Sequence, residues 1–412
     1  MKRKNRIPFL EIHKPRIPKF EGAELIFFVS YTVYLVYMIL SVSFFYRYIA
    51  SVWKPVFVLC IGLLGLYELV RNGLTMKNIL TVGVIILLFI NIVRVGQGVS
   101  QNAVAAVLFY MFCARKISFR KISRITIWIS GLLLAVIVIS SYAGIIPNYV
   151  GEGDRRREYL GFLYALYGPS LMSNITCLWV YRKKEKLTVP GALVLAVINY
   201  LLFRKTDARL CFLLTMMTLF FGLLLRKHGS FVLRRKLICY VMVFSFILAC
   251  ALSFALTLNY QPSVSWMAKM NSIFGSRLSL GKESLTSIGV SPFGNPGIKW
   301  VGNGLNMYGE KSTDTYLYVD SYYIQVTQRF GYVFMGLILL VSTLAAYRAY
   351  KRKDIYMLSV LFLLAVRFMI DDLYMYLHYN TIWLAAGMLV FSGRTNKAAG
   401  KGSGLDVLTG TA

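Results

Sequence analysis

The sequence has few charged residues and very few acidic ones. Asp and Glu number 17 among 412 residues, against 46 Lys and Arg, and charged residues make up only 15% of the chain. A soluble domain of this size carries closer to a quarter. The basic excess would suit nucleic acid, but 57% of the residues are hydrophobic, which leaves no soluble domain to present a basic surface. We therefore expect no nucleic-acid partner.

Cysteine and histidine are also scarce. The six cysteines all fall in or beside apolar runs, which excludes a disulfide-linked outer domain and gives no metal-ligand spacing. His13, His228 and His378 are too few and too dispersed for a His-rich zinc site. The chain has no phosphate-binding glycine loop, no Gly-x-Ser-x-Gly and no ATP motif. We expect no metal and no cofactor, so the energy for any reaction must arrive with the substrate.

Long apolar runs dominate what is present. A helix needs about 20 apolar residues to cross a bilayer, and backbone groups in lipid must bond within their own segment. The runs predict an all-α polytopic membrane protein with about twelve transmembrane helices. The predicted spans are 25–45, 55–70, 79–95, 100–114, 125–144, 161–181, 188–203, 209–225, 237–258, 330–348, 355–370 and 378–392.

The basic residues predict the orientation. With the N-terminus in the cytoplasm, 30 of the 46 Lys and Arg fall in cytoplasmic segments, as the positive-inside rule requires. Both termini are then cytoplasmic, and basic clusters set the topology and contact lipid head groups. The predicted order is a basic tail 1–24, nine spans in 25–258, a large outer loop 259–329, three spans in 330–392 and a disordered tail 393–412.

The long outer loop is the most informative segment. It contains Trp266 and Trp300 and several Pro and Gly, which is too aromatic for a disordered linker. Its first half predicts one amphipathic helix, Ser265–Gly289, lying on the membrane surface or against the bundle. Arg277 falls within the apolar stripe of that helix. It either extends to water along its aliphatic stem or points into a site for an anion.

Other arginines on the outer side run against the positive-inside bias. Arg155, Arg156 and Arg157 share a short loop, and Arg209 begins a span. Salt bridges with neighbouring acidic residues would explain the first group, but they explain Arg209 less well. Arginine binds phosphate oxygens through a planar fork and stays charged in a dry site. Several such residues facing a lipid-embedded bundle suggest a lipid-linked phosphate or pyrophosphate ligand.

Four stretches resemble a known family. Arg156-Arg157-Glu-Tyr-Leu-Gly-Phe leads into a span, and Thr206-Asp-Ala-Arg209 stands at the outer start of another. Ser272-Ile-Phe-Gly-Ser-Arg277-Leu precedes Gly289-Val-Ser-Pro-Phe-Gly294, and Val319-Asp320-Ser-Tyr-Tyr closes the loop. In order and side, these resemble the Wzy-type polysaccharide polymerases, within the O-antigen ligase-like class of bacterial membrane glycosyltransferases. The motifs cover about residues 150–335 only.

The resemblance implies a GT-C-like fold in the bacterial cytoplasmic membrane and a polymerase of O-antigen, capsule or exopolysaccharide. Its substrates would be glycans on undecaprenyl pyrophosphate, and its partners a flippase and a chain-length regulator. Arg155, Arg156, Arg157, Arg209 and Arg277 would bind pyrophosphate. Asp320 would be the catalytic base, with Arg209 and Arg277 as catalytic cations. Tyr322 and Tyr323 would stack on sugars, and Arg329, His378 and Asp372 rank below these residues.

The sequence is compatible with other functions and with other catalytic bases. The chain is also compatible with a glycan ligase, although ligases usually carry His where this chain has Asp320, or with a flippase for lipid-linked oligosaccharide. Flippases usually contain two repeated halves, and none is visible in this sequence. Glu283 and the Asp371-Asp372 pair are rival bases. Asp320 itself would otherwise cap the helix that follows it or pair with Arg329.

Overall fold

The computed structural model describes residues 22–73, 75–96, 98–151 and 156–391. These residues form helices joined by irregular segments, and the extended pairings among them are isolated bridges. Four short 3-10 turns are η1 (Ala50–Val52), η2 (Ala114–Lys116), η3 (Lys184–Lys186) and η4 (Leu373–Met375). The helices are α1 (Gly22–Ser41), α2 (Tyr46–Ile49), α3 (Trp53–Asn72), α4 (Met76–Val95), α5 (Val99–Cys113), α6 (Phe119–Tyr142), α7 (Tyr167–Lys183), α8 (Val189–Thr206), α9 (Arg209–Arg234), α10 (Lys236–Val243), α11 (Ser245–Leu258), α12 (Ser265–Ile273), α13 (Arg277–Ile288), α14 (Tyr322–Phe330), α15 (Tyr332–Lys351), α16 (Ile355–Arg367) and α17 (Ile382–Phe391).

Each of the twelve predicted spans coincides with a helix or with a pair of helices. Seven helical segments are long and apolar enough to cross a membrane, and an eighth is added if α10 and α11, which meet at a 61° bend, form one span. The all-helical, polytopic class is therefore confirmed for the described residues. The largest difference in boundaries is at the span predicted as 209–225, since α9 continues to Arg234. The span predicted from residue 161 begins only at Tyr167, after positive φ values at Leu160 and Gly161.

Two short apolar helices, α16 and α17, lie inside the bundle. α16 has 13 residues and α17 has 10, and most of their side chains are buried. α3, α4 and α8 instead expose rows of large apolar side chains such as Leu66, Leu87 and Leu201, as expected of helices that face lipid. Some buried polar groups are paired between helices: Tyr31 Oη lies 2.7 Å from Thr126 Oγ1, for example.

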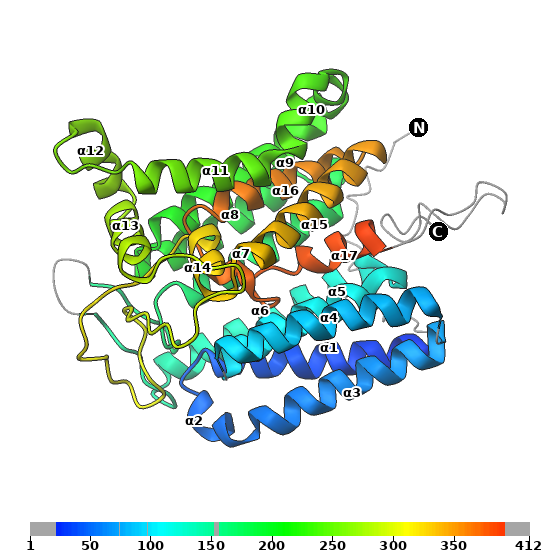
Figure 1. Cartoon of the computed structure of the whole chain (residues 1–412), viewed down its shortest axis with the longest axis horizontal. Coiled ribbons are helices and arrows are strands. Elements are labelled where there is room, and N and C mark those ends of the chain that lie inside the picture. Colours follow the sequence, from blue (N-terminus) through cyan, green and yellow to red (C-terminus); the bar gives the residue numbers. More distant parts are fainter. Residues whose placement is uncertain (1–21, 74, 97, 152–155, 392–412) are drawn as a thin grey trace, which may run out of the picture.

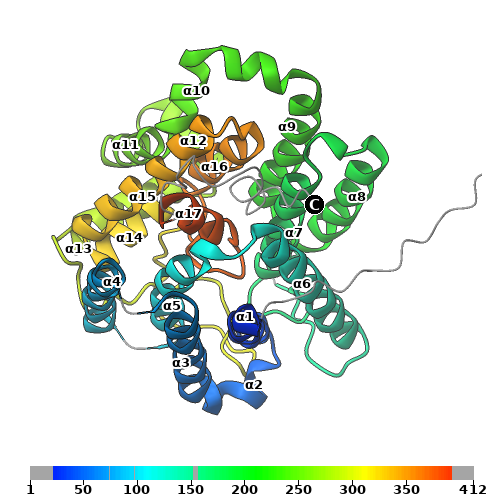
Figure 2. The same cartoon turned by 90° about the vertical axis from the view of Figure 1, so that its right-hand side faces the viewer.

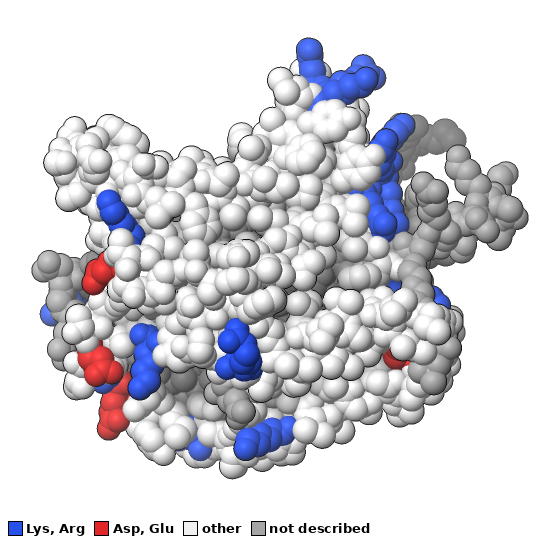
Figure 3. Space-filling model, in the orientation of Figure 1, with Lys and Arg blue, Asp and Glu red and all other residues white. Residues whose placement is uncertain are grey.

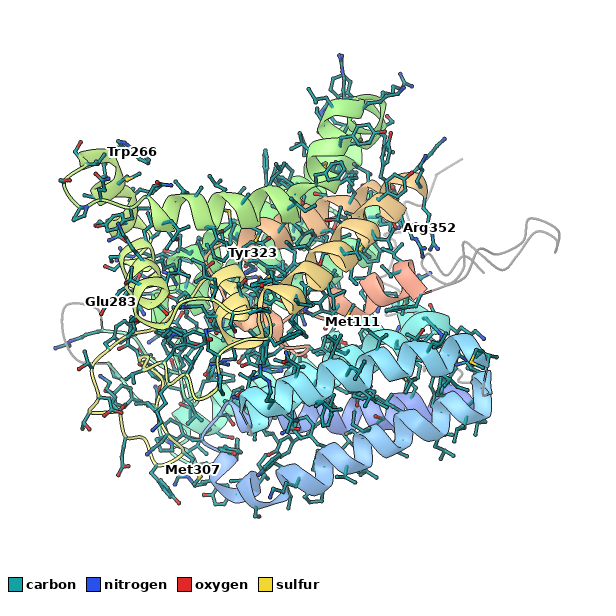
Figure 4. The ribbon with its side chains drawn as sticks, in the orientation of Figure 1. Met111, Trp266, Glu283, Met307, Tyr323 and Arg352 are labelled. Carbon is teal, nitrogen blue, oxygen red and sulfur yellow. The ribbon has the colours of Figure 1, made fainter. Side chains whose placement is uncertain are left out.

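α17 joins the two halves of the bundle. It packs against α5 on one side and α15 on the other, and it lies between the N-terminal helices and the α9–α16 group in Figures 1 and 2. Gly387 of α17 touches the backbone of Met111, the residue labelled in Figure 4, since a Cβ there would lie 2.2 Å from the Met111 carbonyl oxygen. Any side chain at Gly387 would push α17 away from α5.

The two ends of the bundle differ in charge and structure. In Figure 1, α1 begins and α17 ends at the end opposite the irregular segment 289–321. On the face drawn in Figure 3, basic side chains mark the end that carries α10, whereas acidic and basic side chains mix at the loop end. Most of the predicted tails, 1–24 and 393–412, lies outside the described residues.

Candidate functional site

The helix predicted over Ser265–Gly289 is broken in the structure, so that expectation is corrected. Gly275 and Ser276 have φ values of +63° and +66°, which end α12 and prevent one continuous α-helix. Asn271 joins the two pieces, because its Oδ1 accepts backbone N–H groups from the first turn of α13 at 3.0 and 3.1 Å. The apolar stripe therefore does not run through Arg277, which instead begins α13.

Arg277 is held by three oxygen atoms. Its Nε donates to the Ile370 carbonyl at 3.0 Å, and its Nη1 donates to the Phe274 carbonyl at 2.6 Å. The same Nε lies 3.2 Å from Oδ2 of Asp320, and only 18% of the Arg277 side chain is exposed. The guanidinium is thus fixed within the protein, and the alternative that it simply extends to water does not hold.

Asp320 ends the irregular loop segment just before α14. The N-cap residue of α14 is Ser321, so Asp320 does not occupy the capping position, and its ion pair is with Arg277 rather than Arg329. Its side chain is only 14% exposed. Burial raises the pKa of the Asp320 carboxyl above its usual value, and the nearby Arg277 and Arg157 guanidinium groups oppose that rise.

A cavity of about 200 Å³ lies where these residues meet. Its wall combines the loop before α7, the start of α9, the α12–α13 junction, the segment before α14 and the segment after α16. The wall contains both hydrophobic and polar side chains, with charged groups of both signs among them. The lining residues are Arg157, Tyr164, Leu166, Asp207, Ala208, Arg209, Leu210, Cys211, Leu214, Ser272, Ile273, Gly275, Arg277, Asn303, Tyr316, Asp320, Ile370 and Asp371.

Three of the predicted anion-binding arginines line this cavity: Arg157, Arg209 and Arg277. The buried Nε of Arg157 has no hydrogen-bond partner among the described residues. Arg209 is 67% exposed, and its Nε donates to Asp207 Oδ1 at 2.9 Å. Arg156 is exposed and is not among the lining residues, and Arg155 lies outside the described residues. The nearby Glu158 pairs with Lys205 at 2.9 Å.

Two more carboxyl groups lie beside the cavity. Asp371 lines it and forms a 3.7 Å ion pair with Arg367. Burial raises the pKa of Asp371 to about 6, although Arg367 opposes the shift. Asp372 is behind the wall, where its Oδ2 accepts the Tyr318 hydroxyl at 2.7 Å and the Gln325 amide at 2.9 Å. Burial and the neighbouring carboxylates raise its pKa to about 7.

The tyrosines predicted to stack on sugars are core residues, so that expectation is corrected. Tyr322 is stacked on Phe368 with ring centroids 4.1 Å apart, and the Tyr323 hydroxyl donates to the Ala365 carbonyl at 2.9 Å. Both side chains are at most 2% exposed, and Figure 4 labels Tyr323 inside the bundle. They point inward because they form the first turn of α14, which is buried on nearly every side.

Tyr164 and Tyr316 line the cavity instead. Sequence reasoning missed them because both lie in irregular segments, where no periodicity reports which way a side chain points. Tyr164 packs edge-on against Tyr167, with centroids 5.5 Å apart. Burial raises the pKa of the Tyr316 hydroxyl, and the Asp320 carboxylate raises it further. The two rings supply the aromatic surface that the prediction assigned to Tyr322 and Tyr323.

The remaining candidates lie elsewhere. Arg329 is positioned over the Trp300 ring, 4.7 Å from its centroid, and His378 is buried between Tyr376 and Tyr379. Neither lines the cavity. Glu283 is exposed on the outside of α13, as predicted and as Figure 4 shows.

The arrangement favours binding of an anion next to a carboxylate. Fixed guanidinium groups donate directional, charge-assisted bonds to phosphate oxygens, and a partly buried carboxyl with a raised pKa is suited to proton transfer. No group of three or more potential metal ligands occurs in the described part of the chain. Comparisons with protein-family models, curated proteins and solved structures gave no match.

Proposed function

We propose that this chain is a membrane glycosyltransferase that polymerises oligosaccharide repeat units linked to undecaprenyl pyrophosphate. The observation that carries the proposal is the convergence of Arg157, Arg209, Arg277 and Asp320 on one cavity at the loop end of an apolar helical bundle. These residues come from four separate segments of the chain. A lipid-linked pyrophosphate suits this place, because its polyprenyl tail requires lipid and its head group requires cations.

In the proposed reaction, the donor glycan is transferred from pyrophosphate to a sugar hydroxyl of a second lipid-linked unit. The bond between the anomeric carbon and the pyrophosphate oxygen breaks, and the oxygen leaves with the electron pair. A bond forms between that carbon and the acceptor oxygen, whose proton passes to the Asp320 carboxylate. Arg157, Arg209 and Arg277 stabilise the charge that develops on the leaving group.

The proposal includes twelve membrane crossings in a GT-C-like arrangement in the bacterial cytoplasmic membrane. Both termini are then cytoplasmic, and the cavity faces the outer side. The helices α16 and α17, with 13 and 10 residues, are too short to cross the membrane alone. Each would cross together with the irregular residues next to it, surrounded by longer helices. Such irregular backbone is tolerated at membrane depth where protein encloses it.

A glycan ligase is the second candidate, since it would use the same donor and the same cations. Asp320 stands where ligases usually carry His, which favours the polymerase. A flippase is less favoured, because alternating access requires a path that opens to both sides. The cavity lies at the loop end, next to the α12–α13 junction.

The test uses purified protein in lipid nanodiscs and lipid-linked repeats extracted from cells that lack this chain. We expect a ladder of lipid-linked polymers, and no ladder with Arg277→Ala. Transfer of glycan to lipid A or to a wall polymer, without a ladder, would assign the chain as a ligase. Movement of the lipid-linked unit across a vesicle membrane without glycosidic bond formation would assign it as a flippase.

A further inference from the structure

The charged groups of the cavity largely balance one another. Three arginines and three aspartates line it, and Arg367, which does not line it, pairs with Asp371. Two of the lining arginines already have carboxylate partners, Arg209 with Asp207 at 2.9 Å and Arg277 with Asp320 at 3.2 Å. A diphosphate carries at least two negative charges and gains little from cations that are already paired with carboxylates. It needs a carboxylate to give up its cation.

The ion pairs Arg209–Asp207 and Arg277–Asp320 differ in the strength of their electrostatic attraction. Arg209 is 67% exposed, so water and salt weaken its attraction to Asp207. The Arg277 and Asp320 side chains are only 18% and 14% exposed, and charges interact more strongly in such a setting. Carbonyl oxygens of Ile370 and Phe274 also hold Arg277. Arg277 therefore keeps its place if Asp320 leaves.

We propose that the Asp320 carboxylate occupies the position on Arg277 that a diphosphate oxygen takes when substrate binds. Substrate and Asp320 then compete for one guanidinium. This inference rests on the proposed function, since it assigns a role in the unliganded site to the proposed base. Arg157 is the lining arginine for which no carboxylate partner is seen, and its buried Nε has no hydrogen-bond partner among the described residues.

Competition links donor binding to catalysis. While Asp320 is paired with Arg277, the cation reduces the proton affinity of the carboxylate. Once diphosphate replaces it on Arg277, the carboxylate lies near an anion rather than a cation and becomes a stronger base. Asp320 is therefore free to accept a proton only when a donor is bound. In the unliganded site the same contact prevents an uncompensated buried charge on either side chain.

The test measures binding rather than turnover. Inorganic pyrophosphate and undecaprenyl pyrophosphate are titrated separately into the full-length protein in nanodiscs, by calorimetry. Asp320→Asn keeps the shape and one oxygen of the side chain but removes its charge. We expect it to bind pyrophosphate roughly tenfold more tightly than the unmodified protein, since a competing charge worth about 1.4 kcal/mol gives that factor. If Asp320→Asn gains affinity only for undecaprenyl pyrophosphate, Asp320 competes with the head group of the lipid-linked diphosphate and not with free pyrophosphate.

Glu158→Gln is the matched control. It removes one negative charge from the same end of the molecule, but Glu158 pairs with Lys205 and is not a lining residue. We expect its affinity to change less than twofold. The double variant Arg277→Ala with Asp320→Asn should not show this increase in pyrophosphate affinity, because the Arg277 guanidinium for which substrate and Asp320 compete is absent. Asp320→Ser should show the same gain as Asp320→Asn if the carboxylate is the competitor.

Equal or weaker binding by both folded Asp320 variants would overturn the inference, as would an equal gain in Glu158→Gln. Absence of binding of both probes to every variant would overturn it too. If the unmodified protein forms polymer but Asp320→Asn gains no affinity, the competition fails and the proposed function stands. If the gain is found but no glycan is transferred by the unmodified protein, the competition stands and the glycosyltransferase assignment fails.

Discussion

Arg277 and Asp320 form an ion pair with 3.2 Å between Nε and Oδ2, although one begins α13 and the other lies just before α14. The irregular segment 289–321 makes this possible by returning the chain to the start of α13. Its backbone is anchored on the way, since Leu305 N–H donates to the Leu163 carbonyl at 2.7 Å. The loop thus brings a cation and a carboxylate to one cavity wall.

Arg277→Lys should reduce polymer formation nearly as much as Arg277→Ala, by roughly 10²–10³-fold in rate. A lysine ammonium cannot reproduce the planar fork that reaches two carbonyls and a carboxylate. The measurement is the rate of ladder formation, with Lys269→Ala on the exposed side of α12 as a control. Normal rates for Arg277→Ala and Arg209→Ala would refute the proposed anion site.

Asp320→Asn should lower turnover by roughly 10²–10⁴-fold while the protein still inserts in normal amount. The helix that follows should be retained, because Ser321 rather than Asp320 occupies its N-cap position. In cells, lipid-linked single repeats should accumulate. Wild-type rates in the purified assay would exclude Asp320 as the base, and Asp371 would then be tested first because it lines the same cavity.

Stability should rise as the pH falls through the range of the two buried aspartates. The pKa of Asp371 is raised to about 6 and that of Asp372 to about 7, above the usual unfolded value near 3.9. The folded protein therefore binds these protons more tightly, and the resulting stabilisation is complete below pH 4 and lost as pH rises to 7. One such group changes stability by at most about 1.4 kcal/mol per pH unit.

The measurement for this pH effect is the thermal midpoint in detergent between pH 8 and pH 5. Asp372→Asn should show a flatter profile than the unmodified protein, because it removes the group with the higher pKa. Glu283→Gln is the control, since that carboxylate is exposed on α13. A profile that stays as steep in Asp372→Asn would show that other groups bind the protons.

Topology can be tested with single new cysteines at exposed positions. Ser230 and Ser312 are exposed in the structure, and the charge distribution predicts that the first is cytoplasmic and the second is outside. In intact cells an impermeant thiol reagent should label Ser312→Cys and not Ser230→Cys. The six native cysteines are buried or half-buried and give a low background. The reverse labelling pattern would invert the orientation.

The helical bundle follows from the sequence because membrane helices are specified by composition over about 20 residues. The apolar runs predicted a helix at each of twelve places, and a helix occurs at each one. The number of these helices that cross the membrane does not follow from the sequence in the same way. Helices such as α17, with 10 residues, are buried by neighbours, and a hydropathy pattern does not distinguish burial by protein from burial by lipid.

The candidate site was predictable as a set of residue types, and its geometry was not. Arginines on the side predicted to be outer stand out against the charge bias, and Arg157, Arg209 and Arg277 do line one cavity. The partner of Arg277 and the burial of Tyr322 depend on contacts between distant segments. Sequence therefore determined which charged side chains are available at this end of the bundle. Tertiary structure decided which of those side chains face one cavity, because the direction of a side chain in an irregular loop is set by long-range packing.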